Sequence, residues 1–270
     1  MIAVNLGPLA LPVSPLLMLI SVIIGFTVTS LVAKKTGEQH KDSASNALLL
    51  ILVAGLVFGR LVFVLRFADS YDSFWQMLDI RDRGIDYMAA AFSAAVVLFF
   101  KLRQRQLRKA LLSGVITMLA LFTLFTLVIT AGRAQAVLPD TSFMQLDGKR
   151  VKITDINQQQ PTVVNLWASW CPPCQREMPV LQQAEQRYSD ISFILLNQRE
   201  PTHTVEHFLQ QNGLSFKHVL LDNKGDMATA MGAFGLPITL YFDANGQLVH
   251  SHMGELSAAS LQQSIEQYLK

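Results

Sequence analysis

The sequence predicts an α/β domain, a mixed sheet with helices on both faces, that follows an all-α membrane domain of about four transmembrane helices. Two broad observations predict this division. The first half of the chain holds four long apolar stretches, and the second half alternates strand-type and helix-type patterns. A third observation is local, since the only two cysteines, Cys171 and Cys174, stand where an apolar strand-type run passes into a helical one. We predict domains at residues 1–136 and 137–270.

The composition averages these two halves. Hydrophobic residues make up 51% of the chain, and the mean hydropathy is +0.32. The net charge is only +2, so there is no broad electrostatic case for nucleic acid as a partner. The placement of the charges is more informative than their sum.

The candidate membrane spans are four apolar stretches at residues 9–33, 46–65, 85–100 and 110–131. The first, second and fourth reach the ~20 residues that cross a bilayer core, whereas the third is short. The first lacks a basic segment before it, which argues against a cleavable signal peptide.

Basic residues between the spans predict the orientation. Lys34, Lys35 and Lys41 follow the first span, and residues 101–109 carry five Lys or Arg and no acid. By the positive-inside rule both of these loops are cytoplasmic. The N-terminus, the middle connection and the second half are then expected outside the inner membrane, in the periplasm if the cell is Gram-negative. Disulfide chemistry also persists in such a compartment, so two independent observations agree.

Charged residues in and after the second span have several interpretations. Arg60 lies inside this span, where an ionised side chain is costly and often functional. It could bind a lipid phosphate, pair with Asp69 or Asp86, or extend to the outer membrane face. The charged cluster of the middle connection is expected to be a solvated loop with local ion pairs; its members are Asp79, Arg81, Asp82, Arg83 and Asp86.

The N-terminal half resembles the start of prolipoprotein diacylglyceryl transferase. The resemblance rests on Asn-Leu-Gly-Pro-Leu-Ala-Leu at residues 5–11 and Gly-Arg-Leu-Val-Phe at residues 59–63. The His-Gly-Gly stretch that this enzyme has is absent near residues 83–87. The resemblance therefore implies an anchor among membrane lipids, without transferase activity.

Alternating elements and turn signals predict the sheet of the second half. Asp147-Gly148 and Asn245-Gly246 each predict a hairpin, and Ser257 is a plausible helix cap. The expected strands are 143–146, 150–153, 162–167, 191–197, 219–221, 239–243 and 247–252, and the expected helices are 172–188, 204–211, 226–231 and 257–268.

Two thiols separated by two residues can close into a disulfide and reopen, so they can carry a pair of electrons. At a helix start, unpaired backbone N–H groups stabilise a thiolate, which favours Cys171 as the nucleophile and Cys174 as the resolving thiol. Pro172 and Pro173 remove two such donors, which favours a more reducing couple. A structural disulfide or half of a zinc site stays open as an alternative.

Several segments of this half resemble the TlpA/ResA group of membrane-anchored thioredoxin-family thiol:disulfide oxidoreductases. They are Val-Asn-Leu-Trp-Ala-Ser-Trp-Cys-Pro-Pro-Cys at 164–174, Glu-Met-Pro at 177–179, Gly-Leu-Pro at 235–237 and Phe-Asp-Ala-Asn-Gly at 242–246. The resemblance spans nearly all of residues 138–270. It implies a thioredoxin-like fold and dithiol–disulfide exchange.

The resemblance also implies roles for residues around the cysteines. Pro237 corresponds to the cis-proline that faces the dithiol and pairs with substrate, although Ile238 follows where relatives commonly carry Thr. Glu177 corresponds to the proton acceptor for Cys174, with an exposed helix carboxylate as the alternative. Asn165 stands where cytosolic thioredoxins have a buried acid. Trp167 and Trp170 are expected to be packing residues, with Trp170 shielding the disulfide.

A metal site is the main alternative for the cysteines. His203 and His207 have zinc-like spacing and would complete a four-ligand set with Cys171 and Cys174. The gap from Cys174 to His203 is far longer than the ~12–15 residues of a compact finger. We therefore expect no metal and no other cofactor, and surface positions for these histidines and for His250 and His252.

The sequence thus favours a membrane-anchored periplasmic reductase of protein disulfides. Since no cysteine lies in the spans, its electrons are expected from a separate transmembrane donor of the DsbD/CcdA kind. The alternatives are a disulfide oxidase or isomerase, a copper or zinc metallochaperone that uses the same cysteines, or a lipid-modifying protein, against which the missing histidine argues.

Overall fold

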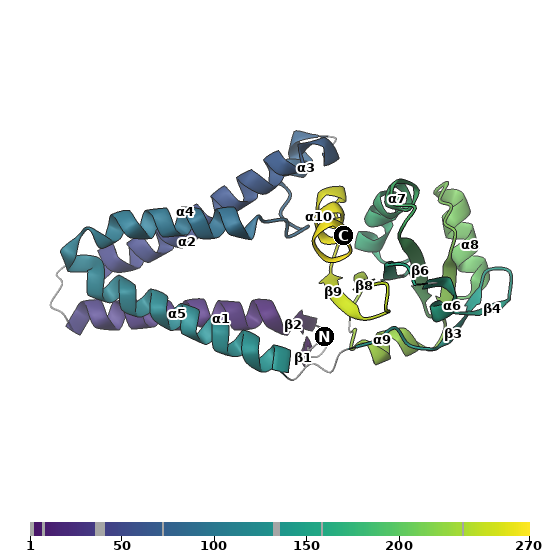
Figure 1. Ribbon diagram of the computed structural model, residues 1–270, viewed down its shortest axis with the longest axis horizontal. Helices are drawn as coiled ribbons and strands as arrows, with labels where there is room; N and C mark the ends of the chain where they lie inside the picture. Colours follow the sequence, from purple (N-terminus) through teal and green to yellow (C-terminus); the bar gives the residue numbers. More distant parts are fainter. Residues whose placement is uncertain are drawn as a thin grey trace. The chain divides into compact units, whose positions relative to one another are not determined.

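A computed structural model describes the chain except for residues 1, 2, 7, 8, 36–40, 72, 132–135, 158 and 234 (Figure 1). Contacts divide it into two compact units. The helical unit comprises Val13–Asp69 and Gly84–Gly132, and the sheet unit comprises Met1–Pro12, Ser70–Arg83 and Arg133–Lys270. The boundary between residues 136 and 137 stays a prediction, and the segment Ser70–Arg83 belongs with the sheet unit.

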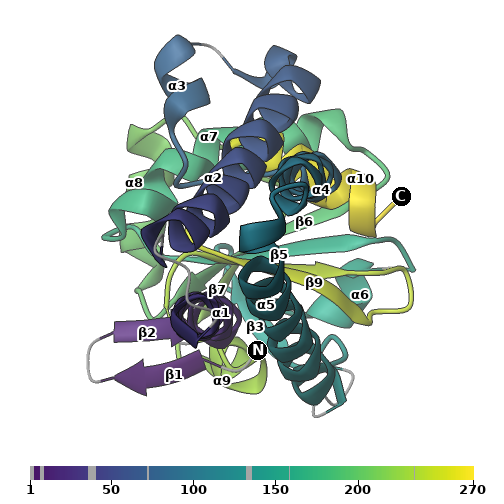
Figure 2. The same ribbon diagram turned by 90° about the vertical axis from the view of Figure 1, so that its left-hand side faces the viewer.

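The helical unit is built from two packed helix pairs. α1 (Val13–Lys35) packs against α5 (Arg105–Ala131), and α2 (Lys41–Arg66) packs against α4 (Tyr87–Leu102), as Figures 1 and 2 show. Small residues permit the close approach within a pair. A Cβ atom on Gly114 of α5 would collide with Thr29 of α1, so only glycine fits there.

Three helices in the described part of the chain are long and apolar enough to cross a membrane: Leu16–Lys35, Ser43–Arg66 and Arg105–Ile129. α4 has 16 residues, about 24 Å at 1.5 Å per residue, which is less than a hydrocarbon core of ~30 Å. The predicted count of four spans is therefore approximate. The first helix also begins later than predicted, because Leu9–Pro12 forms a strand, β2, that pairs antiparallel with β1 (Ala3–Leu6).

The charges at the ends of α2 and α4 are satisfied within the protein. Arg60 Nη1 donates to the carbonyl of Gly84 at 2.8 Å. Arg66 Nη1 lies 3.7 Å from Asp86 Oδ2, and Asp86 Oδ1 also accepts from the amide of Ala89 at 2.9 Å, which caps α4. This hydrogen bond of Arg60 is not among the contacts predicted for it, and lipid binding stays a prediction. A 3₁₀ turn η1 (Ala68–Ser70) and α3 (Phe74–Leu78) follow α2.

The sheet unit contains a mixed sheet of seven strands in the order β4-β3-β7-β6-β5-β8-β9. β5, β6 and β7 are parallel, and the other pairs are antiparallel. Both predicted hairpins, β3–β4 and β8–β9, are confirmed. The bounds are β3 Ser142–Gln145, β4 Arg150–Lys152, β5 Thr162–Trp167, β6 Ser192–Gln198, β7 Val219–Asp222, β8 Ile238–Phe242 and β9 Leu248–Met253.

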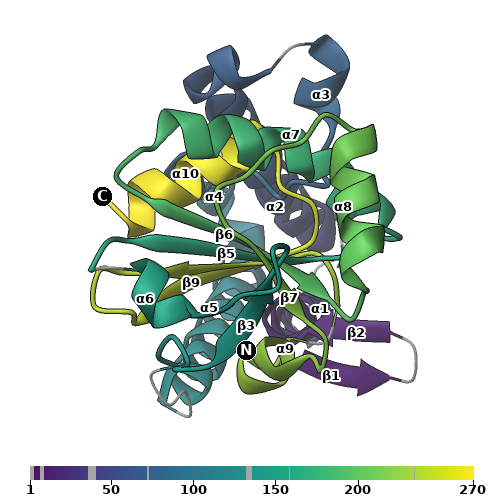
Figure 3. The ribbon, with the colours of Figure 1, turned by 90° about the vertical axis from the view of Figure 1, so that its right-hand side faces the viewer.

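Helices cover both faces of this sheet, as predicted (Figure 3). One face carries α7 (Pro172–Arg187), α8 (Thr202–Gln211) and α10 (Ala258–Tyr268), and the other carries α6 (Ile153–Asn157) and α9 (Asp226–Ala230). β5 lies between these two cores, and all six of its residues are buried. The strand that leads to the cysteines is therefore held from both sides.

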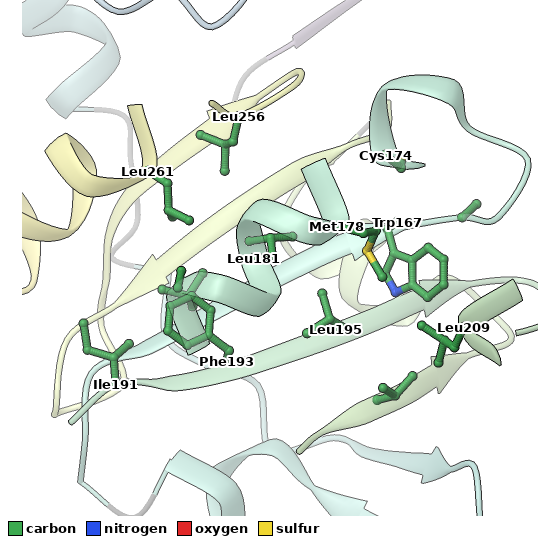
Figure 4. Packing of buried hydrophobic residues seen from close by; sticks show 14 of the residues in the cluster. Trp167, Cys174, Met178, Leu181, Ile191, Phe193, Leu195, Leu209, Leu256 and Leu261 are labelled. Carbon is green, nitrogen blue, oxygen red and sulfur yellow. The ribbon is translucent and has the colours of Figure 1, made fainter. Parts of the chain in front are cut away.

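Two local details bear on the sequence predictions: the end of β4 differs from its prediction, and the cap of α10 agrees with it. Ile153 begins helix α6 and does not extend β4, because Ile153 and Ile156, three residues apart, are then both buried in the same core. Ser257 is the cap of α10, since its Oγ accepts from the amide of Ser260 at 3.1 Å. Figure 4 shows Met178 and Leu181 of α7 lying over β6.

Candidate redox site

Cys171 and Cys174 form a disulfide at the start of α7, with their Cα atoms 5.2 Å apart. Cys171 is the N-cap of the helix, and the amide of Cys174 donates to its sulfur at 3.3 Å. Pro172 and Pro173 occupy the first helical positions, where a proline costs little. The sulfur of Cys171 thus lies at the positive end of the helix dipole, where a thiolate is stabilised.

The two sulfurs differ in their surroundings. Cys171 is 3% exposed and Cys174 is 0% exposed. Both belong to the apolar core that holds Trp167 and Met178, and they differ only in this small exposure of Cys171 (Figure 4). An incoming thiol can therefore reach Cys171 more readily than Cys174, in line with their predicted order of action.

Glu177 is fully buried, one turn after Cys174 on α7, so the alternative of an exposed carboxylate is wrong. Asn165 Nδ2 donates to its Oε1 at 2.7 Å, and the amide of Leu256 donates to its Oε2 at 3.0 Å. Burial raises the pKa of Glu177 to about 8, although both hydrogen bonds oppose this by favouring the carboxylate. A group with this pKa can release and accept a proton near neutral pH.

Asn165 lies in the middle of β5 and holds Glu177 without titrating. It is 1% exposed, and its Nδ2 also donates to Thr239 Oγ1 of β8 at 3.0 Å. These two residues are direct partners in the β5–β8 ladder. The central strands of the sheet therefore fix the amide that contacts the buried acid.

The peptide bond between Leu236 and Pro237 is cis, as the family resemblance implied. Pro237 directly precedes β8, and the ladder pairs its neighbour Ile238 with Leu166 of β5. Continuing this register places Pro237 opposite Trp167, at the end of β5 from which the cysteine turn emerges. The fold thus brings residues 167 and 237 to the same end of the adjacent strands β5 and β8.

Glu200 is a buried acid that the sequence prediction missed. It is 7% exposed, and it accepts from the Ser169 amide at 2.6 Å, from Ser169 Oγ at 2.5 Å and from Asn197 Nδ2 at 2.7 Å. It therefore ties the turn before Cys171 to the end of β6. The signal in the sequence was an acid two residues after the end of a buried strand, which no motif marks.

The two tryptophans have different environments. Trp167 is fully buried and lies 5.4 Å from the ring of Phe208 between centroids, so its packing role is confirmed. Trp170 is 68% exposed, so it is not a packing residue of the core, and its shielding of the disulfide stays a prediction. It lies in the turn that joins β5 to α7, outside both buried layers.

The histidines take no part in the cysteine site. His203 and His207 are exposed on α8, and within the described residues no three His, Cys, Asp or Glu side chains are grouped to hold a metal. His250 and His252 are partly buried, contrary to prediction, because His250 lies against the end of α10 and His252 Nε2 lies 3.3 Å from the carbonyl oxygen of Glu255. His250 stacks on Tyr268 with centroids 4.1 Å apart, and burial lowers the pKa of both histidines to about 4.

A disulfide at the start of α7 and a buried acid one turn later, on a mixed sheet with helices on both faces, are the features of a thioredoxin-like thiol-disulfide oxidoreductase. The Redoxin family model matches residues 133–268, and the prolipoprotein diacylglyceryl transferase model matches residues 1–135. The chain therefore belongs to the Redoxin family through its C-terminal half and to the prolipoprotein diacylglyceryl transferase family through its N-terminal half.

The chain is also similar to individual proteins. The chain is 29% identical to thiol-disulfide oxidoreductase ResA of Geobacillus thermodenitrificans over 139 residues, which cover 51% of this chain and 79% of that protein. It is 28% identical to sporulation thiol-disulfide oxidoreductase A of Bacillus subtilis over 167 residues, 60% of this chain and 99% of that protein. The crystal structure of a putative thiol:disulfide interchange protein DsbE from Chlorobium tepidum is 28% identical, with a TM-score of 0.46, over 50% of this chain and 96% of that one.

Proposed function

We propose that this protein reduces protein disulfides on the outer side of the cytoplasmic membrane. The observation that carries the proposal is the Cys171–Cys174 pair at the start of α7 with the buried carboxyl of Glu177 one turn further on. Cys171 would be the nucleophile, Cys174 the resolving thiol and Glu177 the group that accepts and returns the proton of Cys174.

The exchange balances in two steps. The thiolate of Cys171 attacks one sulfur of a substrate disulfide, so that a mixed disulfide forms and the other substrate sulfur leaves as a thiolate. Cys174 then gives its proton to the carboxylate of Glu177 and attacks the sulfur of Cys171. The second substrate sulfur leaves with the electron pair, and the Cys171–Cys174 disulfide remains. Two electrons have passed from the protein to its substrate.

The helix start supports the reducing direction. A strong oxidant stabilises its nucleophilic thiolate with many N–H donors, which lowers the thiol pKa and favours the dithiol form. Here Pro172 and Pro173 offer no N–H, while Cys174 supplies one donor to the sulfur of Cys171. Weaker stabilisation of the thiolate favours the disulfide, so the couple gives up its electrons more readily.

Pro237 is proposed to pair with the substrate backbone beside Cys171. The family resemblance supports this role, and so does the position of Pro237 directly before β8, opposite the end of β5 that leads into the cysteine turn. Ile238, fully buried, does not itself supply a substrate-facing side chain.

The sequence supports a proposal for the location of the sheet unit and for its source of electrons. Basic loops after the first and third apolar stretches support a periplasmic sheet unit. No cysteine lies in the apolar helices, so thiol exchange cannot cross the membrane within this chain. We therefore propose a DsbD/CcdA-like transmembrane protein as the donor that regenerates the dithiol.

Trapping tests the exchange mechanism. In Cys174→Ser the first step can occur but the second cannot, so substrates should accumulate as mixed disulfides on Cys171. Cells that express the full chain with this substitution should show adducts on a non-reducing gel that disappear on reduction. The matched control, Cys171→Ser, should show none. Absence of adducts from Cys174→Ser, with the variant folded and present in the membrane, would contradict the mechanism.

A further inference from the structure

A short charged segment, residues 79–83, lies against the loop 254–257 within the sheet unit. The expected local ion pair is present, since Arg81 Nη2 lies 2.6 Å from Asp79 Oδ2. The predicted solvation of the whole segment is wrong, however, because Asp82 is only 6% exposed. Its Oδ2 accepts from the hydroxyl of Ser257 at 2.7 Å, which compensates part of the cost of burying a carboxylate.

Three consecutive residues of the loop connect this segment to the redox site. Glu255 Oε2 lies 4.0 Å from Arg81 Nη1 and 2.6 Å from Nη2 of Arg176, which is on α7. The next amide, that of Leu256, donates to Glu177 Oε2 at 3.0 Å. The two loop residues that flank Leu256 are thus each held by the charged segment: Glu255 contacts Arg81, and Ser257 contacts Asp82.

We propose that Arg81 and Asp82 are positioning residues for the redox site, which hold Glu255 and Ser257 so that the Leu256 amide stays on Glu177. The proposal rests on the proposed function, in which Glu177 exchanges a proton with Cys174. It gives the connection between α2 and α4 a part in the chemistry. This connection would act through the loop, without contacting the cysteines.

The groups around Glu177 determine whether its pKa rises or falls when the contacts of Arg81 and Asp82 are lost. Leu256 N–H favours the carboxylate, as does Asn165 from β5, whereas the negative charge of Glu255 opposes it. Other titratable groups near this region are Tyr241 of β8, His252 of β9, whose Nε2 lies 3.3 Å from the carbonyl oxygen of Glu255, and Cys174 of α7 once the disulfide is reduced. Loss of the Asp82 contact would release the Leu256 amide, and loss of Arg81 would leave Glu255 less compensated. Both changes would raise the pKa of Glu177.

The rate at which dithiothreitol reduces the disulfide of the full chain depends on the protonation of Glu177. The pH dependence of this rate therefore measures the pKa of Glu177. In detergent, dithiothreitol thiolate attacks the sulfur of Cys171, and the electron pair of the broken bond leaves on Cys174, which takes a proton from Glu177. The second thiol of dithiothreitol then releases Cys171 and becomes the oxidised ring. The rate, divided by the thiolate concentration of dithiothreitol, should fall as Glu177 loses its proton, with an inflection at about 8.

Substitutions at position 82 distinguish a role in positioning the Leu256 amide from a role only in the stability of the fold. Asp82→Ala should move the inflection upward by about one pH unit, the size expected when a carboxylate loses one hydrogen bond. Asp82→Asn keeps an acceptor for Ser257 and should retain the inflection of the unmodified protein. Asp190→Asn, which removes an exposed acid elsewhere in the sheet unit, is the charge control and should also leave it unchanged.

Each outcome decides a separate point. An inflection that does not move in Asp82→Ala overturns the positioning role, and so does an equal shift in Asp190→Asn. Should Asp82→Ala fail to fold, Arg81→Ala gives the same test, with an upward shift expected and an unchanged inflection against the proposal. An inflection that persists in Glu177→Gln would instead overturn the proton-transfer role of Glu177, and the positioning role with it.

Discussion

Cys171→Ala should reduce disulfide exchange to the uncatalysed background, the largest loss expected for any single substitution in this protein. The first step needs a thiolate at the helix start, and Cys174 cannot replace it because that residue is fully buried in the core. Purified full-length protein in detergent, assayed by reduction of a disulfide-linked fluorescent peptide, measures the loss directly.

The control for this experiment is His203→Ala on α8, an exposed residue that the exchange mechanism does not use. It should retain full activity, whereas a metal-based mechanism that uses His203 as a ligand would lose activity with it. Substantial peptide reduction by folded Cys171→Ala would show that the nucleophile has been assigned wrongly.

Glu177→Gln should produce the second largest effect, on both rate and stability. The raised pKa means that the folded protein keeps a proton on Glu177 between pH 4.5 and about 8, where the unfolded chain has lost it. Unfolding then releases a proton, so the free energy of unfolding should fall as the pH rises through this window, by up to about 1.4 kcal/mol per pH unit. The stabilising contribution of protonated Glu177 is fully present below pH 4.5 and is lost above about pH 8. Gln cannot titrate, so the variant should lack this slope.

The same substitution should slow the release of substrate from the mixed disulfide by about a hundredfold at neutral pH, the usual range for loss of a general base. Urea unfolding at several pH values, followed through the buried Trp167, measures the stability slope. Glu206→Gln, on the exposed side of α8, is the matched control and should keep the slope. A Glu177→Gln protein with the same pH dependence as the unmodified chain would contradict the assignment.

Much of the fold was predictable because the local patterns and the final structure agree. β5 is apolar throughout because both of its faces are covered, and Asn245-Gly246 forms the turn between β8 and β9, with Gly246 at a φ of 75°. The cysteine spacing at a strand–helix junction predicted that the two thiols could close into a disulfide, which the structure contains. These features depend on neighbours in sequence, which periodicity and turn chemistry describe directly.

The residues around the dithiol were harder to predict because their environment comes from distant parts of the chain. Glu177 reads as a helix carboxylate, and only the packing of Asn165 and the Leu256 amide around it shows a buried acid. Glu200 meets Ser169 across 31 positions, and Asp82 meets Ser257 across 175. Burial of a polar side chain by a remote partner leaves no periodic signal. Only the family resemblance pointed to Glu177, and nothing pointed to the other two acids.

The central claim is that the Cys171–Cys174 couple gives electrons to substrates, and its reduction potential tests this most directly. Equilibration of the full-length protein with defined ratios of reduced and oxidised dithiothreitol or glutathione, followed by trapping of free thiols, yields the value. We expect a potential near ~−270 mV, that of thioredoxin. A potential near ~−120 mV, that of a strong disulfide oxidase, would contradict a reductase.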